Sequence, residues 1–241
     1  MFSSEVVKML YTGFWETIYM TLVSTALGYA IGLPLGVTLA VTGKGGIREN
    51  KMVYRILDVI SNVIRSIPFL ILLILIIPLT RFLVGKSYGS SATIVPLVIA
   101  AAPFIARMVE SSLQEVDEGV IEAAKSMGAG TWTIIFRVLL VEARTSLIVG
   151  VTIALGTILG YSAMAGVVGG GGLGDIAIRY GYYRYQTDIM VVTIVILVLI
   201  VQVLQALGMM LSKKLDRNGI RIIHQAFCYG YQQIFQRKHL H

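Results

Sequence analysis

Residues 115–128 read EVDEGVIEAAKSMG and form the longest polar interruption in a chain that consists mostly of apolar stretches. Asp117 and Glu118 place negative charge at the start of a helix, where the helix dipole favours it. Gly128 is placed to end that helix as a C-cap, since glycine adopts the left-handed conformation without steric cost. The stretch therefore predicts a short helix between two apolar halves of the chain.

A second short helix is expected after a Gly-Ala-Gly break. Thr131 can cap it. Its apolar residues recur at helical spacing: Trp132, Ile135, Phe136 and Leu139. Two interpretations fit the whole segment. It is either a surface loop whose apolar face rests on the chain's own membrane domain, or a docking surface for a soluble partner. In the first helix that apolar face comprises Val120, Ala124 and Met127.

The composition assigns the chain to a membrane. Of its 241 residues, 56% are hydrophobic and only 14% are charged, with a mean hydropathy of +0.79. Soluble domains carry about 25% charged residues. We therefore expect a protein of the lipid bilayer.

Five apolar segments predict five transmembrane helices and hence an all-α membrane protein. They lie at about residues 18–41, 57–80, 92–106, 147–168 and 189–212. We expect residues 1–217 to form one transmembrane domain, with a loop at 107–146 and a terminal tail at 218–241. Cys228 is the sole cysteine and all three histidines follow residue 223, so no disulfide within the chain and no metal site is expected.

Small residues predict close helix contacts in two of these spans. The first span has one at every fourth position: Ser24, Gly28, Gly32, Gly36 and Ala40. The fourth span has a similar pair, Gly156 and Gly160. Small side chains on one helix face let a neighbouring backbone approach closely.

The basic residues predict the orientation. With the N-terminus outside and the C-terminus inside, fifteen of the 20 lysines and arginines fall on the inner side. The positive-inside rule selects this arrangement, and it places the 107–146 loop in the cytoplasm. Topology thus accounts for the net charge of +7 without nucleic acid.

Several chemistries are excluded. No G-x-x-x-x-G-K-[ST] motif is present, so the chain does not hydrolyse ATP by that route. Residues 169–174 contain G-x-G-x-x-G formally, but they follow a membrane span rather than a strand. The span cores carry no charged group except near one end of the second span, which disfavours ion-coupled carriers, intramembrane proteases and other catalytic sites.

A solute pathway is the remaining possibility for the bundle. Asp58, Asn62 and Arg65 share one face of the second span, and we expect them to snorkel to the membrane surface rather than to pair. Tyr161, Ser162 and Met164 suit lipid contact or core packing on one interpretation and a pathway on the other. In the pathway interpretation, which also includes Asn62, Met164 and its copy across a two-fold axis form a yielding gate. Five helices are too few to enclose such a path, whereas a dimer supplies ten.

Five sequence segments together resemble the permease subunits of bacterial ABC importers, and most closely the methionine-uptake family. Glu122-Ala123-Ala124, with Gly128 after it, is similar to the EAA loop of these permeases, although Leu140 is followed by valine where the family usually has proline. The other four segments are RSIPF at 65–69, APFIAR at 102–107, GYSAM at 160–164 and GLG at 172–174. The tail after about Arg217 lies outside the resemblance.

The resemblance implies the type I importer fold in a bacterial cytoplasmic membrane and an alternating-access mechanism. It implies a homodimer, two copies of a separate ATPase subunit that binds ATP and Mg²⁺, and an extracytoplasmic methionine-binding protein, often lipid-anchored. No cofactor is expected on this chain. The residues implied to couple to the ATPase are Glu118, Val120, Ile121, Glu122, Ala123, Ala124, Met127 and Gly128. Two alternatives stay open: a permease for another amino acid or small solute, and an ATP-independent channel or facilitator.

Overall fold

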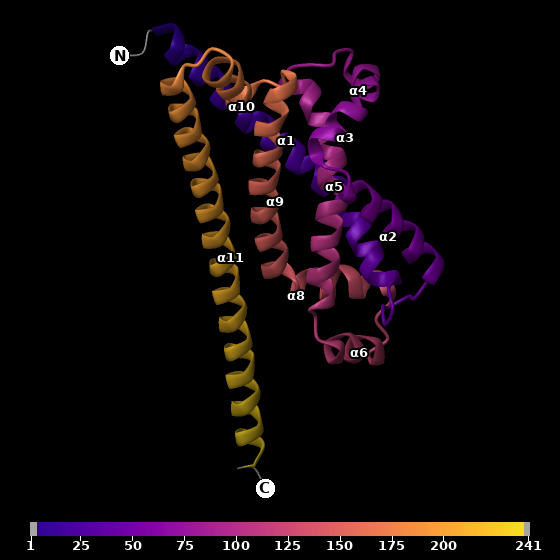
Figure 1. Cartoon of the computed structure of the whole chain (residues 1–241). Coiled ribbons are helices and arrows are strands. Elements are labelled where there is room, and N and C mark those ends of the chain that lie inside the picture. The colour runs from indigo at the N-terminus through magenta and orange to yellow at the C-terminus, as the bar shows by residue number, and fades with distance from the viewer. Residues whose placement is uncertain (1–3, 239–241) are drawn as a thin grey trace.

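The computed structural model describes residues 4–238, with the side chains of residues 4–214, and every regular element in it is a helix (Figure 1). The all-α prediction is therefore confirmed. Four helices are long and apolar enough to cross a membrane: α1 (Ser4–Thr42), α5 (Ser90–Gln114), α9 (Arg144–Ala165) with the turn that follows it, and α11 (Thr187–Lys238) over its first part. The expected tail 218–241 falls on residues whose side chains lie outside the described part.

The segment expected as the second span is broken. It comprises α2 (Lys51–Ser66), α3 (Phe69–Leu75) and α4 (Ile77–Val84), and α2 and α3 meet at 101°. The break lies at Ile67, whose backbone is extended at φ −82° and ψ 124°. Proline disfavours the helical conformation of the residue before it, and Pro68 follows directly. If the bent pair is one span, the count is five.

The glycines of α1 lie where this helix crosses α5. A Cβ atom added to Gly32 would lie 2.7 Å from the carbonyl oxygen of Ala102, and one added to Gly36 would lie 2.5 Å from that of Ala106. Gly28 faces the side chains of Ala101 and Ile105 in the same way. The two backbones therefore approach too closely for any larger side chain.

The pair on α9 behaves differently. Gly156 faces Gln205 of α11, whose Nε2 would lie 3.4 Å from an added Cβ. Around Gly160, no atom of the described residues lies within 4 Å of that position. One copy of the chain therefore does not supply the close contact expected at Gly160.

The glycine-rich segment after α9 is hydrogen-bonded to the first half of α1. It contains the turn η2 (Gly166–Val168), α10 (Gly172–Ile176) and η3 (Ala177–Tyr182). The backbone N–H of Gly172 donates to the Glu16 carboxylate at 2.7 Å, and that of Leu173 donates to Thr17 Oγ1 at 2.9 Å. The segment thus docks on α1, with no strand before it among residues 4–238.

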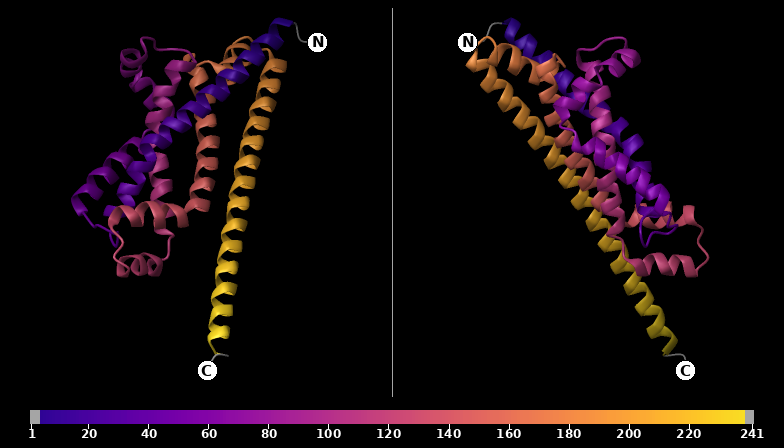
Figure 2. Two further views of the ribbon diagram at one scale, coloured as in Figure 1. Left: turned by 180° about the vertical axis from the view of Figure 1, so that it is seen from behind. Right: turned by 45° about the vertical axis from the view of Figure 1, so that its right-hand side comes forward.

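The two ends of the molecule differ. The N-terminus, α10 and the start of α11 lie at one end, and the start of α2 and the short helix α6 (Glu118–Ser126) lie at the other (Figures 1 and 2). We call these the N-terminal end and the loop end. The polar stretch at residues 115–128, which contains α6, therefore projects from one end of the bundle.

The α1–α5 contact predicts a sensitive position. Gly36→Ala should force the helices apart, because its Cβ meets a backbone oxygen rather than a movable side chain. Overpacking of this kind costs about 1–3 kcal/mol. We expect a lower midpoint of thermal unfolding in detergent, followed by fluorescence-detected size exclusion. Gly130→Ala is the matched control, since no atom of the described residues lies within 4 Å of its Cβ position. Equal midpoints for the two variants would contradict the contact.

Candidate functional site

Helix α6 begins and ends as the sequence predicts. Asp117 is the N-cap, and its carboxylate accepts the N–H of Gly119 at 2.8 Å. At the other end Gly128 has φ +80° and donates to the carbonyl of Lys125 at 2.9 Å, while Ala129 donates to that of Ala124 at 3.0 Å. This pair of bonds is a Schellman motif, which fixes where the chain turns away from the helix.

The segment after the glycine break is less regular than expected. It consists of α7 (Thr131–Thr133), the π-helical η1 (Ile134–Leu139) and α8 (Leu140–Glu142). Thr131 is the first helical residue, its predecessor Gly130 occupies the cap position, and no side chain caps this helix. The prediction that Thr131 caps it is therefore wrong, since a threonine caps only from the position before the first helical residue.

The apolar residues of the loop divide between an inner and an outer surface. Ala124 is 5% exposed and packs in one core cluster with Ile134 and Leu139, and Ile121 lies against the same cluster. Val120 and Met127 point outward instead, and Met127 is 81% exposed. Of the three residues expected to form one apolar face of α6, Ala124 is therefore buried, whereas Val120 and Met127 are exposed.

Two aromatic residues extend the open part. Trp132 is 73% exposed, and its ring stacks on that of Phe136 with a centroid distance of 5.8 Å. Together with Val120 and Met127 they form what we call the loop surface. The coupling residues implied by the resemblance include neither aromatic, since their helical spacing predicted only a short helix and left open whether its apolar face rests on the membrane domain or meets a partner. Exposed apolar groups gathered on a projection are typical of an interaction site.

Helix α6 also carries exposed acidic residues. Glu118, Glu122 and Ala123 are exposed on α6, at the end of the molecule opposite to the N-terminus (Figure 2). Exposed carboxylates on the same helix as exposed apolar residues suit charged residues of a partner.

A polar cluster joins α5 to α2 at the loop end. Arg107 of α5 forms an ion pair with Asp58, donates to Asn62 Oδ1 at 3.2 Å and to Glu110 at 2.7 Å. Asn62 also donates to Asp58 at 3.1 Å. The prediction that Asp58 and Asn62 snorkel is therefore wrong, because both bind Arg107, which lies 49 positions after Asp58 and 45 after Asn62.

The candidate pathway residues lie in three different environments. Tyr161 stacks on Phe69 of α3, with ring centroids 4.5 Å apart. Ser162 is 1% exposed and donates to the carbonyl of Leu159 at 2.7 Å. Met164 is 51% exposed. Of these three, Met164 alone is open to whatever lies beside the bundle.

Near the N-terminal end, Asp175 of α10 pairs with Arg179 at 2.8 Å. Burial raises the pKa of the Asp175 carboxyl above its usual range, and the neighbouring arginine opposes that shift. Among the described residues, no three His, Cys, Asp or Glu side chains are grouped so that they could hold a metal ion. This end therefore supplies a structural ion pair beside the glycine-rich segment.

Four apolar helices, a broken fifth segment and a helical projection at one end define a multi-pass helical membrane protein. The family described as "Binding-protein-dependent transport system inner membrane component" matches residues 32–217. The chain belongs to this family. It is accordingly a multi-pass component of the inner membrane that serves transport and is not itself an enzyme.

Similar proteins cover nearly the whole chain. A "Probable D-methionine transport system permease protein MetI" from Vibrio cholerae is 50% identical over 86% of this chain and 92% of its own length. A "Methionine import system permease protein MetP" from Bacillus subtilis is 48% identical over 86% and 94%. A solved structure described as "Inward facing conformations of the MetNI methionine ABC transporter" has a TM-score of 0.88 at 48% identity, covering 89% of this chain and 99% of that one.

The caps of α6 predict a local change in stability. Asp117→Ala removes the acceptor for the Gly119 N–H, and losing such a cap costs about 1 kcal/mol. Amide hydrogens at 119–123 should then exchange about fivefold faster. Asp117→Asn keeps a side-chain acceptor and should exchange like the wild type. Equal protection in all three proteins, measured by hydrogen–deuterium exchange, would show that the cap does not hold the helix.

Proposed function

We propose that this chain is the membrane-spanning permease subunit of an ATP-driven importer that carries methionine across the cytoplasmic membrane. The observation that carries the proposal is the near full-length likeness to proteins named as methionine permeases, which includes the loop helix as well as the spans. The membership of the binding-protein-dependent transport family supports the class of importer, and the names of the relatives support methionine as the solute. A permease for another amino acid would show itself by competition in uptake assays.

The energy comes from a separate chain in this proposal. The sequence holds no phosphate-binding loop of the Walker type, so ATP and Mg²⁺ belong to two copies of a partner ATPase. The loop surface supplies the contact with that ATPase, since α6 is capped at both ends and presents Val120 and Met127 outward. Because both of its ends are fixed by caps, α6 can transmit a movement of the ATPase to the spans without unwinding.

The proposed orientation places the N-terminus outside and α6 in the cytosol. The excess of basic residues on the inner segments supports it. So does the separation of the N-terminus and α6 to opposite ends of the bundle (Figure 1). The loop surface then faces the compartment that contains ATP.

The pathway runs between two copies of the chain. Gly160 and Met164 lie on a face of α9 that the described residues leave uncovered, and Met164 is half exposed. A second copy across a two-fold axis would cover this face and bring two Met164 side chains together. Flexible thioether side chains suit a gate that must yield to a solute and then close.

Transport then follows alternating access. ATP binding closes the ATPase dimer, α6 moves with it, and the spans open outward to receive methionine from an extracytoplasmic binding protein. Hydrolysis returns the inward-open state. The binding protein selects the solute, which agrees with spans that carry few charged groups.

The loop surface predicts a coupling defect. Met127→Asp should lower ATP-dependent methionine uptake by about tenfold or more, because an unpaired carboxylate in an apolar contact costs several kcal/mol. The measurement is uptake by vesicles that contain the permease, its ATPase and its binding protein.

Met127→Leu keeps the apolar contact and is the matched control. Both variants should insert and fold equally, since this side chain projects into solvent in the single chain. Wild-type uptake by Met127→Asp would remove the loop surface from the coupling mechanism.

A further inference from the structure

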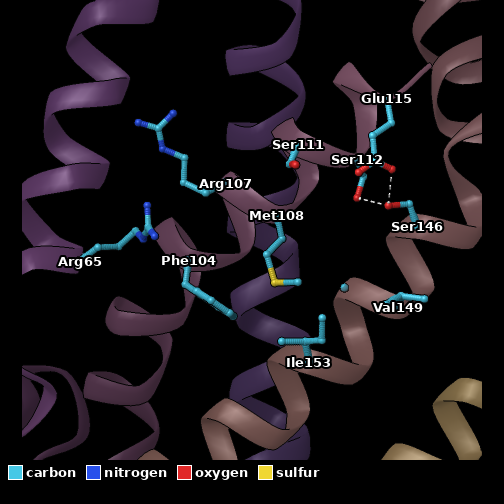
Figure 3. A pocket seen from close by; sticks show the side chains of 11 residues that line it. Arg65, Phe104, Arg107, Met108, Ser111, Ser112, Glu115, Ser146, Val149 and Ile153 are labelled. Atoms are coloured by element: carbon cyan, nitrogen blue, oxygen red, sulfur yellow. Dashed lines mark hydrogen bonds between the residues drawn. The ribbon is translucent and has the colours of Figure 1, made fainter. Parts of the chain in front are cut away.

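A pocket of about 290 Å³ lies at the loop end between α2, α5 and α9 (Figure 3). Its apolar wall is formed by Phe104, Met108 and Ile153, and Arg65 lies on one side of it. Glu115 lies on the opposite side, where it accepts a hydrogen bond from Ser146 at 3.1 Å. The pocket thus combines an apolar surface with a cation and an anion.

Arg65 is the open cation of this pocket. No acidic side chain among residues 4–214 lies within ion-pair distance of it, whereas Arg107 beside it is held by Asp58 and Glu110. A guanidinium group presents paired N–H donors that match the two oxygens of a carboxylate. Arg65 can therefore receive an organic acid without first giving up a partner.

The local charges indicate what kind of solute fits. The charged groups that line the pocket are Arg65, Arg107 and Glu115, and Arg107 is already held by Asp58 and Glu110, which lie outside the lining. With Arg107 paired, Arg65 and Glu115 remain as one cation and one anion, which favours a solute that carries both charges. A zwitterion with one carboxylate, one ammonium group and an apolar side chain suits both the charges and the wall. The volume is near the lower end of small-molecule pockets, about 300–1,000 Å³, which suits a solute of that size.

The pocket shares a helix face with the proposed gate. Ser146, Ile153 and Met164 lie on one face of α9. Met164 is 18 residues, or five turns, after Ser146, and Ile153 is about two turns after Ser146. Ile153 is 48% exposed and Met164 is 51% exposed, so the described residues leave the stripe open at these two positions. The stripe runs about 27 Å along the axis, with the pocket at its loop end.

We propose that this pocket is a release site, where a translocated α-amino acid with an apolar side chain pauses before it enters the cytosol. The carboxylate lies on Arg65 and the side chain lies against Phe104, Met108 and Ile153. The site rests on the proposed function, which it extends by giving the solute a binding place within the permease.

The test uses a methionine analogue that carries a photoreactive diazirine in its side chain and keeps the free amino and carboxylate groups. The complete complex of permease, ATPase and binding protein is reconstituted in vesicles, exposed to the analogue from the cytosolic face and irradiated. Mass spectrometry should find labelled peptides containing Phe104, Met108 or Ile153. Excess methionine should suppress the labelling. Arg65→Gln should lower it by about tenfold, and Arg65→Lys should retain part of it.

Arg48→Gln is the matched control, because Arg48 is an exposed arginine of the same end that does not line the pocket. Its labelling should equal that of the wild type. No labelling of the pocket in a complex that imports methionine would overturn the release site and leave the proposed function standing. Labelling that anionic phospholipid displaces and methionine does not would make it a lipid site instead. A complex that fails to import methionine would overturn both.

Discussion

The close approach of α1 to α5 is the constraint on which the rest of the structure depends. A Cβ at Gly36 would lie 2.5 Å from the Ala106 carbonyl oxygen, so the two backbones nearly touch. In lipid, where no hydrophobic force drives helices together, such packing is a principal source of helix association. α5 is therefore held along its length by a neighbour that leaves it no room to tilt alone.

Helix α5 carries the connections that matter for function. Two residues past its loop end, Val116 joins the apolar core, and Asp117 then caps α6. Arg107 ties the same end to α2. At its other end, Thr93 donates to the Gly170 carbonyl at 3.1 Å and so reaches the segment that α1 holds through Glu16. A displacement applied at α6 is therefore delivered to a helix that is fastened at both ends.

Local patterns predicted part of this correctly. The ends of α6 follow from Asp117 and Gly128 because capping depends on neighbours within a few residues. The small residues of α1 predicted a close contact because their spacing of four repeats over many turns. Neither inference needed knowledge of distant parts of the chain, and the all-helical class followed from apolar length alone.

Other features depended on distant partners. Asp58 seemed free to reach the membrane surface because Arg107 lies 49 positions away in the sequence. The helical spacing of Trp132 and Ile135 predicted a shared helix but not that Ile135 is buried and Trp132 exposed, a difference set by the packing of the π-helical η1. Pro68 was visible in the sequence, but the 101° bend beside it is a property of the packed chain. Such errors arise wherever tertiary contacts override local preference.

The central claim is that the spans are a passive path driven from the cytosolic end. The most direct measurement compares uptake of radiolabelled methionine by vesicles that contain this chain alone with uptake by vesicles that also contain the ATPase and the binding protein. The account predicts ATP-dependent accumulation in the second preparation and no flux above protein-free vesicles in the first. Saturable methionine flux through the chain alone, independent of ATP, would contradict it.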